Sequence, residues 1–208
     1  MTNILDLKAE KNNLYTTFDN LIPRSSKEKL LNQKGMTIWV TGLSGSGKTT
    51  IAQSLEKKLH KKNIITKLLD GDNIRVGINN NLGFSDKDRE ENIRRIAEVS
   101  KLFVECGIVT INCFVSPTIG ARENAKNIIG KADFIEVFVD TSLEECEKRD
   151  VKGLYKKARK GQIKDFTGIS SPYEPPLNPS ITIKTFNRTI EECGQELYKF
   201  VYQKIKLN

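Results

Sequence analysis

Residues 42–49 read Gly42-Leu43-Ser44-Gly45-Ser46-Gly47-Lys48-Thr49 and fit the pattern G-x-x-x-x-G-K-[ST]. Glycines in this pattern let successive backbone N–H groups point into one concavity, and a helix that begins near Gly47 adds the positive end of its dipole. Lys48 then reaches the β- and γ-phosphates of a nucleotide, and the Thr49 hydroxyl holds Mg²⁺. We therefore predict an ATP-binding loop made of residues 42–49 and Thr50. The alternative is a glycine- and serine-rich turn with a capping threonine.

The sequence on both sides of this loop favours the first reading. An apolar run at 36–41 precedes the loop, and apolar residues at helical spacing follow it, namely Ile51, Leu55 and Leu59. Further apolar runs predict strands at 64–69, 108–114, 134–139 and 181–184. Because helical patterns alternate with these runs, we predict an α/β fold: a P-loop nucleoside-triphosphate hydrolase-type three-layer sandwich with a mostly parallel five-stranded sheet. Ligands of such a sheet bind at the carboxyl ends of its strands.

The two ends of the chain are less informative. Residues 1–34 are polar and weakly patterned, with a turn signal at 22–26, and we predict an arm lying on a main domain of residues 35–208. Ser85 followed by Asp88 predicts the start of one helix, and Thr189 followed by Glu192 predicts the start of the last.

The positive charge is concentrated in one segment. Lys and Arg number 34 and Asp and Glu number 26, which gives a formal net charge of +8 over 208 residues. Residues 148–164 alone contain eight cations and a single anion, Asp150. Proteins that bind nucleic acid spread their charge over a face and interleave aromatic residues, so the concentration favours a small polyanionic ligand and no nucleic acid. A solvated basic helix is the alternative.

Composition also suggests the compartment. No apolar run approaches the ~18 residues needed to span a membrane, and residues 1–11 lack the apolar segment of a secretory signal. No two cysteines form a C-x-x-C, and His60 is the one histidine, so a zinc site is not expected. We predict a cytoplasmic protein with no membrane partner, an exposed His60 and buried, reduced thiols at Cys106, Cys113, Cys146 and Cys193.

A second group of polar residues follows the run at 64–69. Asp70 and Asp72 lie two residues apart at a predicted strand end, where Asp70 can orient the Mg²⁺ shell and Asp72 can accept a hydroxyl proton and position the attacking oxygen. Arg75 can pair with an anionic substrate. The alternative is an Asx-type turn that caps a short helix. Asp140, at another strand end, is a second candidate for the carboxylate near Mg²⁺. No guanine-reading N-K-x-D occurs, which argues against a GTPase.

An aromatic residue and several polar ones precede and open the helix predicted after Ser85. Phe84 comes just before it, and Arg89, Asn92 and Arg95 fall at i, i+3 and i+6, roughly on one face. An aromatic ring beside arginines suits a base and a phosphate or sulfate. A capped surface helix is the alternative.

Together these stretches resemble the adenylylsulfate kinase (APS kinase) family. The matching strings run in order from about Lys34 to Thr185: residues 37–50, L-D-G-D-N-I-R at 69–75, L-G-F-S-D-K-D-R at 82–89, F-V-S-P at 114–117, F-I-E-V-F-V-D-T at 134–141, C-E-K-R-D-V-K-G-L-Y at 146–155, F-T-G-I at 166–169 and P-Y-E-P-P at 172–176. The resemblance implies transfer of the ATP γ-phosphoryl group to the 3′-hydroxyl of adenosine 5′-phosphosulfate. It also implies a homodimer.

The resemblance assigns roles residue by residue. Acceptor contacts would come from Asp72, Asn73, Arg75, Phe84, Arg89, Asn92, Lys152 and Phe166, with the two phenylalanines against adenine. Residues 149–168 would form a basic lid over both nucleotides, with Arg149 on the ATP side. Ser116 corresponds to a serine described in the family as a phosphoserine intermediate. Because in-line transfer needs no enzyme hydroxyl, we expect Val115 and Ser116 to line the acceptor pocket.

The sequence departs from the family pattern in two places. Residues 118–121 replace a segment that usually carries an aromatic or histidine, an arginine and an acidic residue, and Arg122 is what remains of it. Asp165 stands where a glycine precedes F-T-G. Two alternatives therefore stay open beside an APS kinase: a kinase of the same fold with another small anionic acceptor, and a nucleotide-dependent binding module without turnover.

Overall fold

The computed structural model describes residues 15–207. Outside the described residues lie Asn208 and residues 1–14, which include part of the predicted arm and the segment 1–11 where no secretory signal is expected. Five strands form one sheet in the order β2-β3-β1-β4-β5, and all neighbouring pairs are parallel. This arrangement confirms the predicted α/β sandwich. The strands are β1 (Met36–Thr41), β2 (Thr66–Asp70), β3 (Val109–Cys113), β4 (Phe134–Asp140) and β5 (Ile181–Lys184).

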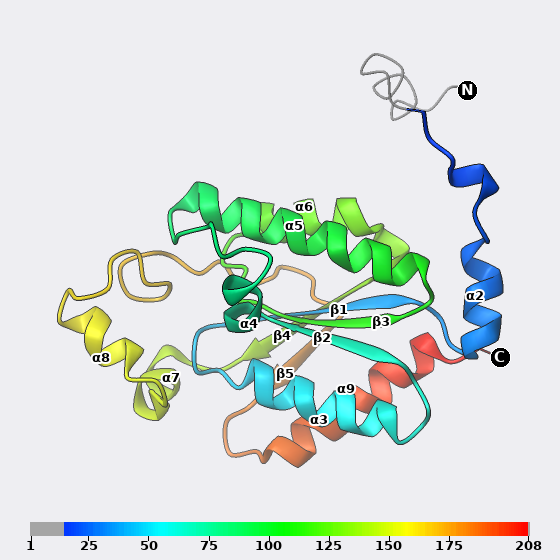
Figure 1. The fold of residues 1–208 in the computed structure, drawn as a ribbon. Helices are drawn as coiled ribbons and strands as arrows, with labels where there is room; N and C mark the ends of the chain where they lie inside the picture. Colours follow the sequence, from blue (N-terminus) through cyan, green and yellow to red (C-terminus); the bar gives the residue numbers. More distant parts are fainter. Residues whose placement is uncertain (1–14, 208) are drawn as a thin grey trace.

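Helices cover both faces of the sheet (Figure 1). The α-helices are α2 (Arg24–Leu31), α3 (Lys48–His60), α4 (Gly71–Val76), α5 (Asp86–Glu105), α6 (Ile119–Ile129), α7 (Leu143–Arg149), α8 (Leu154–Arg159) and α9 (Ile190–Ile205), with 3-10 turns at η1 (Phe18–Asn20) and η2 (Lys131–Asp133). Both predicted capping signals are confirmed: the Ser85 hydroxyl accepts a hydrogen bond from the Asp88 N–H, and Thr189 and Glu192 form a complete capping box. No helix within residues 15–207 is both long and apolar enough to cross a membrane.

Strand alternation sends neighbouring side chains into two separate cores. Ile38 and Val40 of β1 pack with α3 and α9, where Leu55 and Leu197 are fully buried. Trp39 points to the other face and packs with α5 and α6, stacked between Phe114 and Phe134. Because β1 is buried on both faces, its six residues are all apolar or small and none is exposed.

The second strand begins later than the apolar pattern predicts. The run at 64–69 suggested a strand from Ile64, but β2 starts at Thr66. Ile64 belongs to the turn that closes α3, where its N–H donates to the Leu59 carbonyl. Ile65 donates its N–H to the Gln33 side chain instead of to a neighbouring strand. Ile64 is therefore buried in the core beside the sheet, whereas Ile65 is exposed and meets β3 only through its carbonyl, which accepts a hydrogen bond from the Val109 N–H.

The residues before β1 contain a helix that the sequence did not predict. The turn signal at 22–26 marks the start of α2, with Pro23 as its N-cap. Arg24 of α2 binds Asp133 through two hydrogen bonds of 2.6 and 2.8 Å, and the fully buried Gln33 bonds the carbonyls of Ile65 and Gly107. Residues 15–22 extend away from the body of the molecule (Figure 1). The division of the chain at residue 34 stays a prediction.

The cysteines differ in part from expectation. Cys113, Cys146 and Cys193 are buried, but Cys106 is exposed, which contradicts the predicted burial of that thiol. Cys106 is the C-cap of α5, where the chain turns at the surface toward Gly107. His60 is exposed, as predicted.

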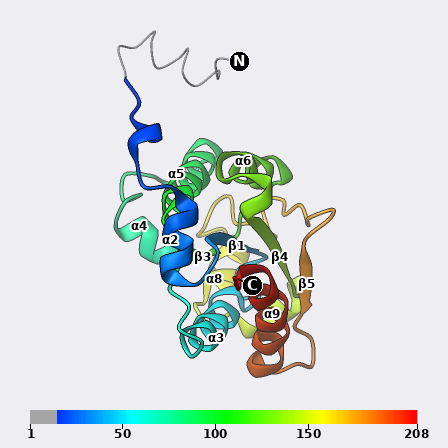
Figure 2. The same ribbon diagram turned by 90° about the vertical axis from the view of Figure 1, so that its right-hand side faces the viewer.

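All strands point their carboxyl ends to the same edge of the sheet. The segments that follow β1, β2, β3 and β4 at this edge are the glycine loop, α4, residues 114–118 and α7 with α8. Figure 2 views the molecule from the amino ends of the strands, and it shows α2 and the C-terminus of α9 on the side that faces the viewer, opposite the edge where these segments lie. The sequence motifs therefore meet where an open parallel sheet binds its ligands.

Candidate active site

The glycine loop joins β1 to α3 and lines a cavity of about 390 Å³. Gly42 has φ +150°, and a Cβ at this position would lie 2.7 Å from the Val139 carbonyl oxygen, so the loop passes β4 too closely for any side chain. Gly47 is the N-cap of α3, as expected. The positive end of α3 therefore faces the cavity together with the loop.

Lys48 is buried at the inner end of the loop. Its Nζ donates to the carbonyls of Gly42 at 2.9 Å and Leu43 at 2.7 Å. Both partners are neutral, so burial lowers the pKa of Lys48 to about 8. A triphosphate in the cavity would supply the negative charge that the ammonium group lacks.

We expect ATP affinity to fall as the pH rises through 8. Above this pH the ligand-free enzyme loses the Lys48 proton, which the bound triphosphate requires, so binding must take a proton up. Kd for AMPPNP should be about tenfold higher at pH 9 than at pH 7. Calorimetry at both values measures it, with Lys48→Met as the control, whose weaker binding should not change between them. An equal change in Kd between pH 7 and pH 9 in both proteins would show that a group other than Lys48 titrates.

Asp70 connects the glycine loop to α4. Its Oδ2 accepts a hydrogen bond of 2.7 Å from the Thr49 hydroxyl, and its Oδ1 accepts one of 3.1 Å from the Asp72 N–H. The second bond makes Asp70 the N-cap of α4, so the Asx-type cap considered as an alternative is present. The same contacts hold Asp72 next to the loop, so the cap is compatible with the catalytic interpretation, which stays a prediction.

The oxygens of Thr49 and Asp70 suit a magnesium ion. Mg²⁺ is bound in such sites by one or two protein oxygens, with phosphates and waters as its other ligands. Within residues 15–207 no group of three or more His, Cys, Asp or Glu could hold a metal, so a metal at this loop would have to share its coordination with a nucleotide. Asp140, the second candidate, does not line the cavity.

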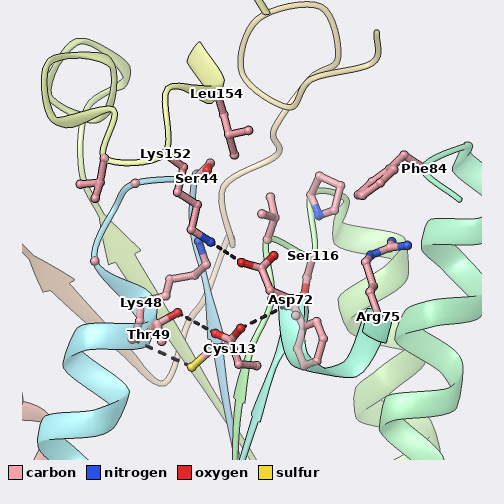
Figure 3. Close-up of a pocket in the computed structure, with 18 of the residues that line it drawn as sticks. Ser44, Lys48, Thr49, Asp72, Arg75, Phe84, Cys113, Ser116, Lys152 and Leu154 are labelled. Atoms are coloured by element: carbon pink, nitrogen blue, oxygen red, sulfur yellow. Dashed lines mark hydrogen bonds and ion pairs between the residues drawn. The ribbon is translucent and has the colours of Figure 1, made fainter. Parts of the chain in front are cut away.

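Asp72 lies at the centre of the cavity. Figure 3 shows it between Lys48 and Thr49 on one side and Arg75 and Phe84 on the other. Its carboxylate forms an ion pair with Lys152, which follows α7. Both side chains are largely exposed, so the pair contributes at most about 1 kcal/mol and a substrate can replace either partner.

Cations and one aromatic ring form the far side of the cavity. The Arg75 guanidinium lies 4.4 Å from the centre of the Phe84 ring, and that of Arg89 lies 5.8 Å from it. Burial and the nearby Arg89 charge lower the pKa of Arg75. Arg75 donates to the carbonyls of Leu82 and Gly83 and has no carboxylate partner among the described residues. The two positive charges of Arg75 and Arg89 therefore favour an anion between them.

Ser116 lines the cavity from the turn after β3. It is 2% exposed and has φ +43°, a left-handed conformation that a serine adopts only when its surroundings impose it. Its hydroxyl accepts a hydrogen bond of 3.0 Å from Trp39 Nε1. An indole N–H only donates, so Trp39 cannot remove the serine proton.

Most of the predicted site residues gather around this cavity. It is lined by Ser44, Gly45, Gly47, Lys48, Thr49, Thr50, Asp70, Asp72, Arg75, Phe84, Arg89, Asn92, Val115, Ser116 and Lys152. The predicted residues outside its lining are Gly42, Leu43, Ser46, Asn73, Arg149 and Phe166.

Arg149, Phe166 and Arg95 do not line the cavity. Arg149 contacts the glycine loop, on the ATP side that the resemblance implies, with Nη1 3.4 Å from the Ser46 carbonyl oxygen. Phe166 packs edge-on against Tyr155 with ring centroids 5.0 Å apart. Arg95, expected on one face with Arg89 and Asn92, instead bonds Glu91 because a six-residue separation rotates it away from the cavity.

Comparison with known proteins gives the same picture as the geometry. The family model described as Adenylylsulphate kinase matches residues 34–184. The adenylyl-sulfate kinase of Bacteroides thetaiotaomicron is 60% identical over 197 residues, covering 95% of this chain and 98% of that protein. The chain belongs to the adenylylsulfate kinase family. The Clostridium acetobutylicum adenylyl-sulfate kinase is 55% identical over 88% of this chain and 90% of its own.

Solved structures of the adenylylsulfate kinase family share the fold. The Mycobacterium tuberculosis APS kinase CysC, in complex with AMPPNP and APS, superposes with a TM-score of 0.78 at 47% identity, covering 81% of this chain and 98% of that chain.

The two departures from the adenylylsulfate kinase pattern lie outside the cavity lining. Thr118 caps α6 by accepting from the Ala121 N–H, and the Ile119 N–H donates to Glu174, so this segment is a helix start. Asp165 has φ +53°, where glycine is the least strained residue, and its carbonyl accepts a hydrogen bond of 2.7 Å from Arg89. Thr118 therefore acts as a helix cap through its side chain, and Asp165 acts through its backbone carbonyl.

Two residues that hold the site were not found from the sequence. Tyr155 is 2% exposed and its hydroxyl donates to the Ser44 carbonyl at 2.8 Å, which ties α8 to the glycine loop. Arg122 is also 2% exposed and donates to Glu136 on β4, to the Ser116 carbonyl and to the Glu174 carbonyl. Two features of the sequence could have pointed to them: Tyr155 is an aromatic residue within the basic segment 148–164, and Arg122 is an isolated arginine after Ser116.

Arg122 should be a large contributor to stability. Arg122→Met leaves Glu136 buried without its partner and frees the strained Ser116 carbonyl, so we expect a loss of about 3–5 kcal/mol in the free energy of unfolding. Urea denaturation measures it. Arg94→Met, which removes an exposed arginine paired with Glu91, should leave the free energy of unfolding nearly unchanged. Equal losses for the two variants would contradict this assignment.

Proposed function

We propose that this chain transfers the γ-phosphoryl group of ATP to the 3′-hydroxyl of adenosine 5′-phosphosulfate (APS), giving 3′-phosphoadenosine 5′-phosphosulfate and ADP. One observation carries the mechanism: the glycine loop and the Asp70–Asp72 turn line the same cavity and are joined by the 2.7 Å bond between Thr49 and Asp70. A donor nucleotide on the loop would therefore direct its last phosphate toward Asp72.

The chain's own residues then have separate tasks. Lys48 and the N–H groups of the glycine loop hold the triphosphate, and the helix end at Gly47 adds positive potential. Asp72 orients the 3′-hydroxyl and accepts its proton as the new O–P bond forms and the bond to ADP breaks. Thr49 and Asp70 would hold Mg²⁺, which when bound neutralises charge on the β- and γ-phosphates. Ser116 lines the acceptor pocket and forms no covalent intermediate.

The acceptor binds on the side of the cavity opposite the glycine loop. Phe84 offers its ring to the adenine, and Arg75 and Arg89 offer two cations to the phosphosulfate. When the anionic acceptor binds, Lys152 leaves its ion pair with Asp72 and pairs with the acceptor instead. The Asp72 carboxylate is then free for catalysis. Residues 149–168 act as a lid whose closure would bring Arg149 and Phe166 to the nucleotides and exclude water. Asn73 is exposed on α4 next to Asp72 in the chain, where an acceptor bound at Asp72 would contact it.

The cavity lining supports APS over another nucleotide-linked anion. Thr118, Ile119, Gly120 and Ala121 form a helix start, and Asp165 contributes its backbone carbonyl. None of these residues lines the cavity. The side chains at the acceptor site are therefore those of the family pattern.

A coupled assay of ADP release tests the proposal. The acceptors are APS, AMP, which lacks the sulfate, and guanosine 5′-phosphosulfate, which changes the base. Turnover with APS at a kcat/KM at least about tenfold above either analogue is expected, with 3′-phosphoadenosine 5′-phosphosulfate as the product. A higher kcat/KM with another acceptor would favour the kinase with a different substrate, and no turnover would favour the binding module. The homodimer implied by the resemblance stays a prediction for light scattering.

A further inference from the structure

Asn92 lines the acceptor side of the cavity although its side chain is almost fully buried, at 4% exposure. Its Oδ1 accepts a hydrogen bond of 2.9 Å from the side-chain amide of Asn79. Its Nδ2 forms no hydrogen bond with the described residues. This nitrogen is also not one of the described polar atoms that are both buried from solvent and without a partner, so it is accessible. The accessible part of this amide is therefore the NH₂ group, and the space it faces is the cavity.

The orientation of the two amides follows from the residue behind them. Arg95 is bound to Glu91 at 2.7 Å, and its Nη1 lies 3.4 Å from Asn79 Oδ1 and 2.8 Å from Asn81 Oδ1. A guanidinium only donates, so the Asn79 atom facing it must be the oxygen. The Asn79 nitrogen then faces Asn92, whose oxygen must face Asn79. The Arg95 guanidinium therefore sets the orientation of the Asn79 amide, and Asn79 sets the orientation of the Asn92 amide.

Asn79 is held in place by its backbone as well. It is fully buried in the turn between α4 and α5, its N–H donates to the Ile74 carbonyl at 3.0 Å, and its carbonyl accepts from the Leu82 N–H at 3.1 Å. The turn between α4 and α5 therefore fixes the main chain of Asn79, and its full burial restricts the side chain to the space beside Asn92.

We propose that Asn79 is a positioning residue that sets the polarity of the acceptor pocket: it fixes the Asn92 amide with its NH₂ toward the cavity, as a donor to an oxygen or ring nitrogen of the acceptor nucleotide. The proposal rests on the proposed function, because it treats this side of the cavity as the acceptor site. Asn79 does not itself line the cavity, and its effect passes entirely through Asn92.

An isosteric variant tests the orientation directly. The new carboxylate in Asn79→Asp offers only oxygens, so Asn92 should turn its NH₂ toward that carboxylate and present its own carbonyl to the acceptor. KM for APS should rise about 10- to 100-fold, while KM for ATP stays within about twofold. Asn81→Asp is the matched control, because Asn81 bonds the same Arg95 but is exposed and does not touch Asn92. Its KM values should equal those of the wild type.

A double-mutant cycle separates positioning from a merely structural role and remains usable if Asn79→Asp does not fold. Asn79→Ala lets Asn92 turn freely and should raise KM for APS about two- to fivefold. In the Asn92→Ala background the same change should have no further effect. Additive effects, or an unchanged KM for APS in Asn79→Asp with wild-type turnover, would overturn the proposal. Failure of the wild type itself to phosphorylate APS would instead remove the proposed function.

Discussion

Asp72→Asn is expected to lower kcat with APS by about 10²- to 10⁴-fold. Asparagine keeps the size and the place of the side chain at the start of α4 but cannot accept the 3′-hydroxyl proton. The variant also lacks the ion pair with Lys152, which is exposed and contributes little to stability. Coupled measurement of ADP release gives kcat, and calorimetry with AMPPNP should give an unchanged Kd at pH 7.

Asp86→Asn is the matched control for this result. Asp86 is an exposed aspartate in the first turn of α5 and does not line the cavity. We expect it to keep wild-type kcat within about twofold. A kcat for Asp72→Asn within about threefold of the wild type would remove Asp72 from the chemistry and leave it as an acceptor contact only.

Lys48→Met is expected to lower kcat by about 10²- to 10³-fold and to weaken ATP binding as well. The ammonium group is buried beside the glycine loop with two neutral carbonyl partners, so its charge has no compensation in the described structure other than nearby Asp70. A low dielectric strengthens its attraction for the transferring phosphoryl group. Methionine retains the length of the side chain and removes the charge.

Single-turnover measurements with saturating ATP separate the two effects of Lys48→Met. Lys67→Met is the control, because Lys67 lies exposed on β2, the strand that ends at Asp70. This variant should turn over like the wild type. If Lys48→Met regains wild-type kcat at saturating ATP, the lysine serves ground-state binding alone, contrary to the mechanism.

Local signals in the sequence located the half of the candidate site that the glycine loop forms. The glycine loop, Lys48 and Thr49 are consecutive, and their function depends on backbone geometry that neighbouring residues set by themselves. The caps at Ser85 and Thr189 and most strand positions were predictable for the same reason. Asp70 and Asp72 were predictable because a strand end is visible in the pattern of apolar residues. The family resemblance, which rests on many such segments in order, added the acceptor.

Contacts between distant segments could not be read in the same way. Arg122 meets Ser116, Glu136 and Glu174 from three different elements, and Tyr155 reaches Ser44 across 111 positions of the chain. Cys106 has apolar neighbours in the sequence, yet it caps α5 at the surface. Arg149 and Phe166 belong to a segment whose place relative to the cavity depends on packing against α8.

The sequence by itself therefore determined the type of fold, the position of the glycine loop and the chemical class of the reaction, since these depend on periodicity and on residues that act next to one another. Only the tertiary structure decided which side chains share the cavity and which way the Asn92 amide faces. The physical reason is that a hydrogen bond has a direction, and the partners that set it here are Asn79 and Arg95, brought together by the turn between α4 and α5.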